Sequence, residues 1–244
     1  MHYFIKPATE ARRCSYVELI ADGPQLAQWP LALPWPLCGV VRFVSHWWGE
    51  PVMQFTACVE THSQDRRLEK APYWVCAYAN NQRHASSDGA FHDLRWELGA
   101  ELSENPAESS FHRALSVSQG TLSILDAEAR VYSRIWCDYE VFVTLDKATW
   151  TAHLYDIYTF QNGSAVGITD GVALVDQRGK SWWWEDRKHQ REKGFPSHLA
   201  AEAMKIQVQK GLASVELDRK RILNAIAGTE LEAGHGTKRY ACRT

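Results

Sequence analysis

The chain has 244 residues, of which 45% are hydrophobic and 23% are charged, as expected for one globular domain or for one domain with an extension. Its formal net charge is −2, so it lacks the excess of basic residues that nucleic-acid binding favours. No run approaches the about 18 consecutive apolar residues of a membrane-spanning helix. Composition therefore predicts neither nucleic-acid nor membrane partners.

The cysteines indicate a reducing compartment. They are scattered along the chain, with no C-x-x-C pair that would favour a zinc site, at Cys14, Cys38, Cys58, Cys76, Cys137 and Cys242. The first residues contain Lys6, Pro7 and Glu10, which interrupt the apolar region that a signal peptide needs. We expect a cytoplasmic protein with no metal site and no resident cofactor.

The first 38 residues show no clear periodicity. Residues 16–20 fit either a short strand or a helical turn. The prolines of QWPLALPWPLCG, residues 28–39, disfavour a helix in that second segment. We interpret residues 1–38 as an arm that lies across the domain surface, anchored by Trp29 and Trp35, or alternatively as a partner-binding motif. The main domain is predicted over residues 39–228, and a mobile polar tail over residues 229–244.

Apolar runs predict five strands, at residues 40–44, 73–79, 121–125, 150–160 and 172–175. A first helix is predicted from Pro51, with Val52, Phe55 and Val59 facing inward. A second is predicted from Pro106, after an Asn105 cap and with Gly120 as its stop, and a third begins after a Ser133 cap. Two more helices are predicted over residues 197–209 and 214–228. Three further segments read as loops, at 83–105, 161–171 and 181–194. The last of these is interpreted as a charged loop or lid that begins with three tryptophans.

Alternating strands and helices predict an α/β fold, with a flavodoxin-like parallel sheet of order 2-1-3-4-5 and helices on both faces. Ligands in such sheets bind beyond the carboxyl ends of the strands, where the strand order reverses. Here the reversal lies between the first and third strands. The turn from Ser45 to Glu50 leaves the first strand, and Asp126 leaves the third. We therefore predict a ligand site between this turn and the helix that Ser133 begins.

Two motifs resemble the Toll/interleukin receptor (TIR) domain family. FVSHWWGEPVMQF is similar to the opening of these domains, which in plants has a strand ending in Phe-Leu-Ser, a Gly-Glu-Asp turn and a helix containing a phenylalanine. The segment from Arg134 to Glu140 is similar to the Trp-Cys-x-x-Glu of the family's third helix. The chain also resembles the related fungal heterokaryon-incompatibility (HET) domain, whose Ser-Tyr-x-Trp-Gly and Trp-Ile-Asp...Asn-Gln correspond to 45–49 and 74–82 here. These resemblances cover residues 39–160.

The resemblance implies a self-associating signalling domain that cleaves NAD, as a substrate, at the nicotinamide–ribose bond. The helix glutamate is catalytic in enzymatic TIR domains, and that role falls on Glu140. A carboxylate can stabilise the oxocarbenium-like state of glycosidic cleavage, and nicotinamide leaves as a neutral group without a general acid. The other predicted site residues would stack on the substrate or hydrogen-bond its ribose or phosphate; they are Ser45, His46, Trp47, Trp48 and Trp136.

Several of these residues also have a purely structural interpretation. Glu140 is equally consistent with a solvent-exposed carboxylate near a helix start. Trp136 suits a core position, and His46 suits a hydrogen-bonded turn histidine. Cys137 lies beside a helix start, a position that can lower a thiol pKa, but the sequence places no histidine base for it.

Two departures from the family pattern favour a different function. Cys76 stands where both families commonly have an aspartate, and the 83–105 loop differs from the self-association loop of plant TIR domains. The alternative is a non-enzymatic homotypic scaffold in stress or immune-like signalling. A nucleotide-binding receiver of another kind is a third interpretation, but the chain has neither G-x-G-x-x-G nor a Walker loop. The expected partners are a second copy of the chain and NAD or a related nucleotide.

Overall fold

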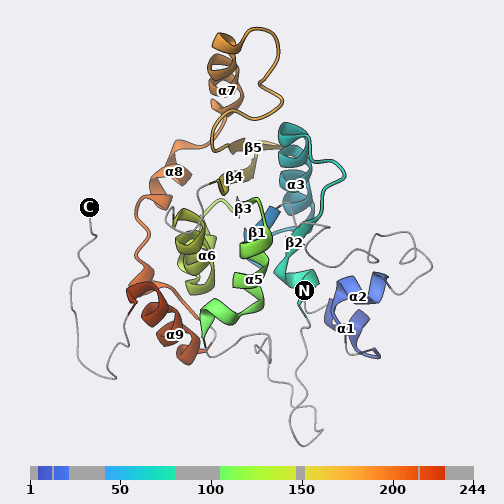
Figure 1. Ribbon diagram of the computed structural model, residues 1–244, viewed down its shortest axis with the longest axis vertical. Helices are drawn as coiled ribbons and strands as arrows, with labels where there is room; N and C mark the ends of the chain where they lie inside the picture. Colours follow the sequence, from blue (N-terminus) through green and yellow to red (C-terminus); the bar gives the residue numbers. More distant parts are fainter. Residues whose placement is uncertain are drawn as a thin grey trace, which may run out of the picture.

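The computed structural model describes residues 5–12, 14–21, 42–80, 105–146, 152–213 and 215–228. Their centre is a five-stranded sheet of order β2-β1-β3-β4-β5 (Figure 1). Its strands are β1 (Arg42–His46), β2 (Tyr73–Val75), β3 (Gly120–Leu125), β4 (Leu154–Gln161) and β5 (Ser164–Ile168). The first four are parallel, whereas β5 is antiparallel to β4. The predicted α/β class and strand order are confirmed, and the expectation of a wholly parallel sheet is wrong at this edge.

The antiparallel edge comes from a two-residue hairpin turn. Asn162 and Gly163 join β4 to β5, and both have positive φ angles, 52° and 82°. Asn-Gly is the preferred sequence for this turn because both positions must adopt left-handed backbone. The prediction of a loop over 161–171 is therefore wrong, and so is the fifth strand at 172–175. That segment instead forms a turn, in which the Asp176 amide donates to the Ala173 carbonyl at 3.0 Å.

Strand β1 extends further than predicted. Ser45 and His46 belong to the strand, and the turn begins only at Trp47, whose carbonyl accepts from the Glu50 amide at 3.2 Å. Strand β2 is shorter than predicted, because the chain passes directly from Val75 into the short helix α4 (Cys76–Ala79). The extension of β1 matters most for the site, since successive strand residues point to opposite faces of the sheet.

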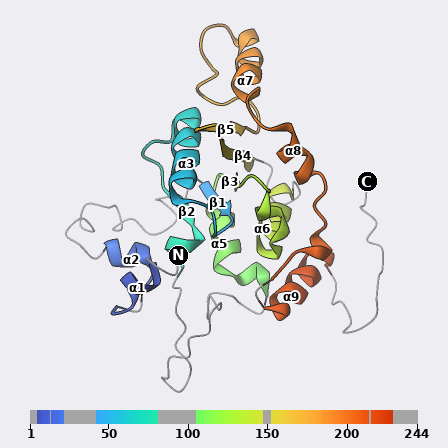
Figure 2. The same ribbon diagram turned by 180° about the vertical axis from the view of Figure 1, so that it is seen from behind.

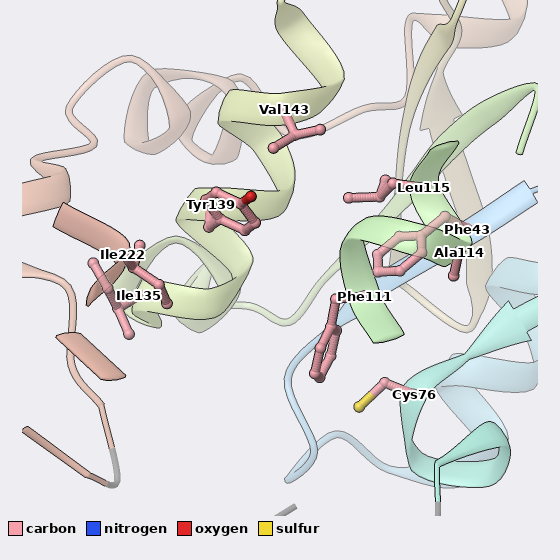
Figure 3. Close-up of a cluster of buried hydrophobic side chains, with 9 residues drawn as sticks. All are labelled: Phe43, Cys76, Phe111, Ala114, Leu115, Ile135, Tyr139, Val143 and Ile222. Atoms are coloured by element: carbon pink, nitrogen blue, oxygen red, sulfur yellow. The ribbon is translucent and has the colours of Figure 1, made fainter. Parts of the chain in front are cut away.

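Helices cover both faces of the sheet (Figures 1 and 2). On one face lie α3 (Val52–Arg66) and the N-terminal helix α1 (Ile5–Thr9), which pack over Val44, Leu122 and Ile124. On the other face lie α5 (Ser110–Val117), α6 (Ile135–Leu145) and α9 (Glu216–Ala227). The second core is shown in Figure 3 and consists of Phe43, Cys76, Phe111, Ala114, Leu115, Ile135, Tyr139, Val143 and Ile222.

Several helix starts differ from those predicted. Asn105 caps only a 3-10 turn (Pro106–Glu108), and α5 has its own cap, Ser109, whose hydroxyl accepts from the His112 amide at 3.3 Å. Ser133 is not a cap, because it ends a 3-10 turn (Arg130–Ser133) ahead of α6. Val52 does not face inward: it is 64% exposed, and the buried positions of α3 are Phe55, Cys58, His62, Ser63 and Arg66.

A buried ionic network joins α3 to β4. Asp156 is fully buried and accepts hydrogen bonds from His62 Nε2 at 2.9 Å and from Arg66 Nε and Nη2 at 2.9 and 2.5 Å. His62 Nδ1 in turn hydrogen-bonds the Tyr73 hydroxyl at 2.8 Å. Burial raises the pKa of Asp156, but the hydrogen bonds and positive charges of His62 and Arg66 outweigh burial and lower this pKa to about 2.

The predicted 181–194 loop is helical. A 3-10 turn (Ser181–Trp183) leads into α7 (Trp184–Glu192), which lies at the end of the molecule beyond β5 (Figure 1). Arg191 anchors it through a bidentate contact with Asp176, at 3.0 and 2.7 Å. The chain continues through α8 (Ser197–Ala203) and a 3-10 turn (Val208–Lys210) to α9, which Gly228 ends in the left-handed conformation, as predicted.

The described part of the N-terminal arm packs on the domain as two short helices, α1 and α2 (Tyr16–Ala21). Ile5 is 7% exposed within the core under α3, and the ring of Tyr16 lies 6.0 Å from that of Tyr78. The predicted anchors Trp29 and Trp35, the 229–244 tail and nearly all of the 83–105 loop lie outside the described residues. Among the described helices, none has the length and apolar character needed to cross a membrane.

Candidate functional site at the end of strand β1

The structure brings the two predicted motifs into contact. Ser45 Oγ, at the carboxyl end of β1, donates a hydrogen bond of 2.5 Å to Glu140 Oε2 on α6. The two residues are 95 positions apart and almost fully buried, at 1% and 4% exposure. Ser45 shares a sheet face with Phe43, which packs against the α5–α6 layer, and this alternation aims its hydroxyl at α6.

Burial changes the protonation state of Glu140. Its pKa is raised to about 8, mainly by burial and in addition by the nearby Asp138 carboxyl, while the hydrogen bond from Ser45 lowers it. The side chain is therefore mostly protonated at neutral pH. The alternative interpretation of Glu140 as a solvent-exposed carboxylate is wrong.

Two other α6 residues near Glu140 in the chain are also buried. Asp138 is 1% exposed, neither carboxyl oxygen has a hydrogen-bond partner among the described residues, and burial raises its pKa to about 7. Its Oδ2 would lie 2.7 Å from a Cβ added at Gly211, so glycine is needed there. Burial also raises the pKa of the Cys137 thiol well above its usual value. A lowered thiol pKa at Cys137 is therefore contradicted, and this thiol has no thiolate character.

Trp136 lies in an aromatic cluster. Its ring stacks on Phe111 at a centroid distance of 5.1 Å and meets Tyr139 edge-on at 6.2 Å. Both partners are core residues of the layer formed by α5, α6 and α9. The structure therefore places Trp136 as the core interpretation predicts, one helical turn from Glu140 but engaged with α5.

His46 faces away from Glu140, because it follows Ser45 on an extended strand. Its ring lies 4.7 Å from that of Phe55 on α3. Burial lowers the pKa of His46 to about 4, against a smaller opposing effect of the Trp47 backbone. Neither ring nitrogen makes a hydrogen bond of good geometry with a described residue, but the Trp47 backbone acts on the His46 pKa as a hydrogen-bond partner does. The interpretation of a hydrogen-bonded turn histidine therefore stays a prediction.

A small pocket lies on this second face, between β1, α1, α3 and α4. It has a volume of about 50 Å³, and its lining includes Ile5, His46, Trp48, Glu50, Phe55 and Tyr78. Trp48 also packs against the core on the α6 side. The structure thus brings together two predicted site residues, His46 and Trp48, with an acid that sequence reasoning did not select. Glu140 is not among the lining residues.

Glu50 is the acid of this pocket. It is 9% exposed, and its Oε2 is buried without a hydrogen-bond partner in the described part of the chain. Burial raises its pKa to about 8, and the charge of Asp126 beyond β3 adds to the effect. The signal for Glu50 was present in the sequence, because it closes the turn that was itself predicted to border the ligand site.

Trp47 stabilises the turn. The guanidinium of Arg130 lies 4.6 Å from the centre of its ring, and Arg130 also pairs with Asp126 at 3.0 Å. A Cβ added at Gly49 would overlap the Trp47 ring, which explains why glycine follows the two tryptophans. Trp47 therefore links the turn after β1 to the turn after β3.

Two buried acids thus lie near the carboxyl end of β1, on opposite faces of the sheet: Glu140 on α6, and Glu50 in the turn before α3. No cluster of three or more histidine, cysteine, aspartate or glutamate residues suitable for a metal ion occurs within the described ranges. Comparisons with protein-family models, with curated proteins and with solved structures gave no match.

Proposed function

We propose that this chain is a TIR/HET-like signalling domain that binds NAD or a related nucleotide at the carboxyl ends of β1 and β3 and hydrolyses its nicotinamide–ribose bond. The observation that supports this proposal is the hydrogen bond between Ser45 and Glu140. It joins the two motifs that resemble the family, at the point where the strand order reverses and where ligands of open α/β sheets bind.

Glu140 has the chemistry that this reaction requires. Cleavage of the bond between ribose C1′ and the ring nitrogen places positive charge on the ribose, and an ionised carboxylate stabilises it. Nicotinamide leaves as a neutral molecule, and water adds to C1′ and releases a proton. The pKa of about 8 means that Glu140 becomes the active carboxylate as the pH rises, and the Ser45 hydroxyl favours that ionised form.

A substrate can reach the Glu140 carboxyl only after a conformational change, because Glu140 is 4% exposed and accepts a hydrogen bond from Ser45. We propose that nucleotide binding or self-association separates α6 from the end of β1. Turnover should then increase with protein concentration more steeply than in direct proportion.

The test is nicotinamide release from NAD by the whole chain between pH 6 and 9. The wild-type kcat/KM, which reports ionisations of the free chain, should rise through a midpoint near pH 8, and Glu140→Gln should abolish turnover. Ser45→Ala should move the midpoint to higher pH, since it removes the hydrogen bond that lowers the Glu140 pKa. Glu128→Gln is the matched control, because that side chain is 60% exposed. Turnover retained by Glu140→Gln would exclude Glu140 from the mechanism.

A second function, a non-enzymatic homotypic scaffold, is favoured by two observations. The Glu140 carboxyl is enclosed in the single chain, and the position where both families commonly have an aspartate holds Cys76, which is 4% exposed in the apolar core. Sedimentation of the chain at increasing concentration, with NAD followed in the same samples, separates the two functions. Oligomers that leave NAD intact would support the scaffold.

A further inference from the structure

The pocket beneath α3 contains polar groups without partners. Glu50 Oε2 is buried and has no hydrogen-bond partner among the described residues. The ring nitrogens of His46 are also buried and make no hydrogen bond of good geometry there, although the Trp47 backbone lies close enough to one of them to raise the His46 pKa. Both side chains line the same space. Buried polar groups in folded proteins almost always have a partner, either protein, water or ligand. The unpaired groups therefore indicate that something polar occupies the pocket.

The charges around the pocket favour a cation. Asp126 is one of the groups that raise the Glu50 pKa, so ionising Glu50 places a second negative charge near that carboxyl. No lysine or arginine belongs to the described lining. The nearby Arg130 is already engaged with Asp126, with Glu128 and with the Trp47 ring. A cation bound beside Glu50 would supply the missing opposite charge.

The size and the walls of the pocket favour a small planar group. One water needs roughly 10–15 Å³ of such volume, so a pocket of about 50 Å³ accepts a head group of three or four heavy atoms. Trp48, Phe55 and Tyr78 supply aromatic walls, and guanidinium is the cation that stacks best on aromatic rings while donating two parallel hydrogen bonds to a carboxylate.

We infer that this pocket binds the guanidinium head group of a small molecule, with Glu50 as the carboxylate partner, Trp48 as the stacking surface and the unprotonated nitrogen of His46 as an additional acceptor. The inference does not depend on the proposed NAD cleavage, because Glu140 lies on the other face of the sheet and is not part of the pocket lining.

Binding of this cation should be coupled to loss of a proton. Glu50 is mostly protonated at pH 7, given its pKa of about 8, and must ionise to pair with guanidinium. The other titratable groups that face it keep one charge state between pH 6 and 8.5: His46 has a pKa of about 4, Cys58 of about 12, and burial raises the Tyr78 pKa above its usual value. The Asp126 carboxylate forms an ion pair with Arg130 at 3.0 Å. Affinity should therefore rise by about ninefold from pH 6 to pH 7 and by about fivefold from pH 7 to pH 8.

The experiment is a titration of the full chain with methylguanidinium, followed by calorimetry and by the Trp48 indole signal in NMR spectra. Urea is the matched ligand, since it has a similar shape without the charge. We expect a Kd of about 1 mM at pH 8, which is well within the affinity that a ligand of this size can reach. We also expect release of a proton on binding at pH 7 and no saturable binding of urea.

Two variants test the assignment. Glu50→Gln should weaken methylguanidinium binding at least tenfold, and Val52→Trp should block the pocket from a lining position that is 64% exposed. Glu128→Gln and Glu140→Gln should bind like the wild type, and the second of these separates this site from NAD cleavage. Equal binding of urea, binding that does not change with pH, or unchanged binding by both pocket variants would overturn the inference and leave a pocket that holds water only.

Discussion

Replacing Glu140 by glutamine should stabilise the protein at neutral pH while removing any activity that Glu140 supports. The buried carboxyl is protonated in the folded chain, and glutamine has the shape and hydrogen-bonding groups of that protonated form. Its amide oxygen can still accept from Ser45, which donates to Glu140 Oε2 in the wild type. The substitution therefore removes the cost of protonating the acid and keeps the contact with β1.

The magnitude follows from the two pKa values of the carboxyl, about 8 in the folded chain and 4.5 as the ordinary value. The raised pKa means that the folded state binds more protons than the unfolded state, so stability is fully present below pH 4.5 and falls as the pH rises towards 8. At pH 7 the raised pKa lowers the free energy of unfolding of the wild type by about 3 kcal/mol, and at pH 4.5 by less than about 0.5 kcal/mol. Glu140→Gln should recover it.

Urea unfolding at pH 4.5 and pH 7 measures this difference directly. At pH 7 the glutamine variant should be more stable by about 3 kcal/mol, or roughly 6–12 °C in melting temperature for a chain of this size. The two proteins should have nearly the same stability at pH 4.5. Glu128→Gln, at an exposed position, should show no difference at either pH. A glutamine variant that is less stable at pH 7, or a gap of the same size at both pH values, would refute the reasoning.

Three further substitutions test other parts of the fold. Asp156→Asn should lower the free energy of unfolding at pH 7 by about 3 kcal/mol, because buried Arg66 loses its charge partner. This loss should shrink below pH 4, where the wild-type contribution falls as pH drops towards the folded pKa of about 2. Gly49→Ala should cost about 1–3 kcal/mol by displacing Trp47, measured by urea unfolding with near-UV circular dichroism. Arg191→Met should speed amide exchange in 184–192 by about tenfold, with Lys205→Met as an exposed control. Unchanged unfolding midpoints or exchange rates would contradict the respective assignment.

The strand order and the meeting of Ser45 with Glu140 were predictable from the sequence. Apolar runs mark β1, β3 and β4 well, and parallel strands bring their carboxyl ends to one edge whatever the exact boundaries are. The contact between residues 45 and 140 follows from that geometry. The sheet face to which each side chain points was not predicted. The predicted strand ended at residue 44, whereas β1 runs to His46, so the alternation that places Ser45 and His46 on opposite faces was missed.

The missed elements share a physical reason, which is that their stability does not come from apolar periodicity. Helix α7 has no buried residue and is held by the ion pairs of Arg191, so its sequence resembles a charged loop. Strand β5 is specified by the Asn-Gly turn before it more than by its own residues. The pocket that contains Glu50 includes Ile5 of α1 in its lining, and the first 38 residues carry no pattern that places this helix on the domain.

The two borders of the sheet limit how copies of this chain can associate. Strand β2 offers only three residues before the backbone turns into α4, and β5 is five residues long, with α3 and α7 packed against it. Such short and covered borders give an incoming strand few free amides and carbonyls to pair with. Among the described elements, helix surfaces and turns therefore offer a filament or dimer more to join through than the sheet edges do, and growth of this kind would leave each sheet separate.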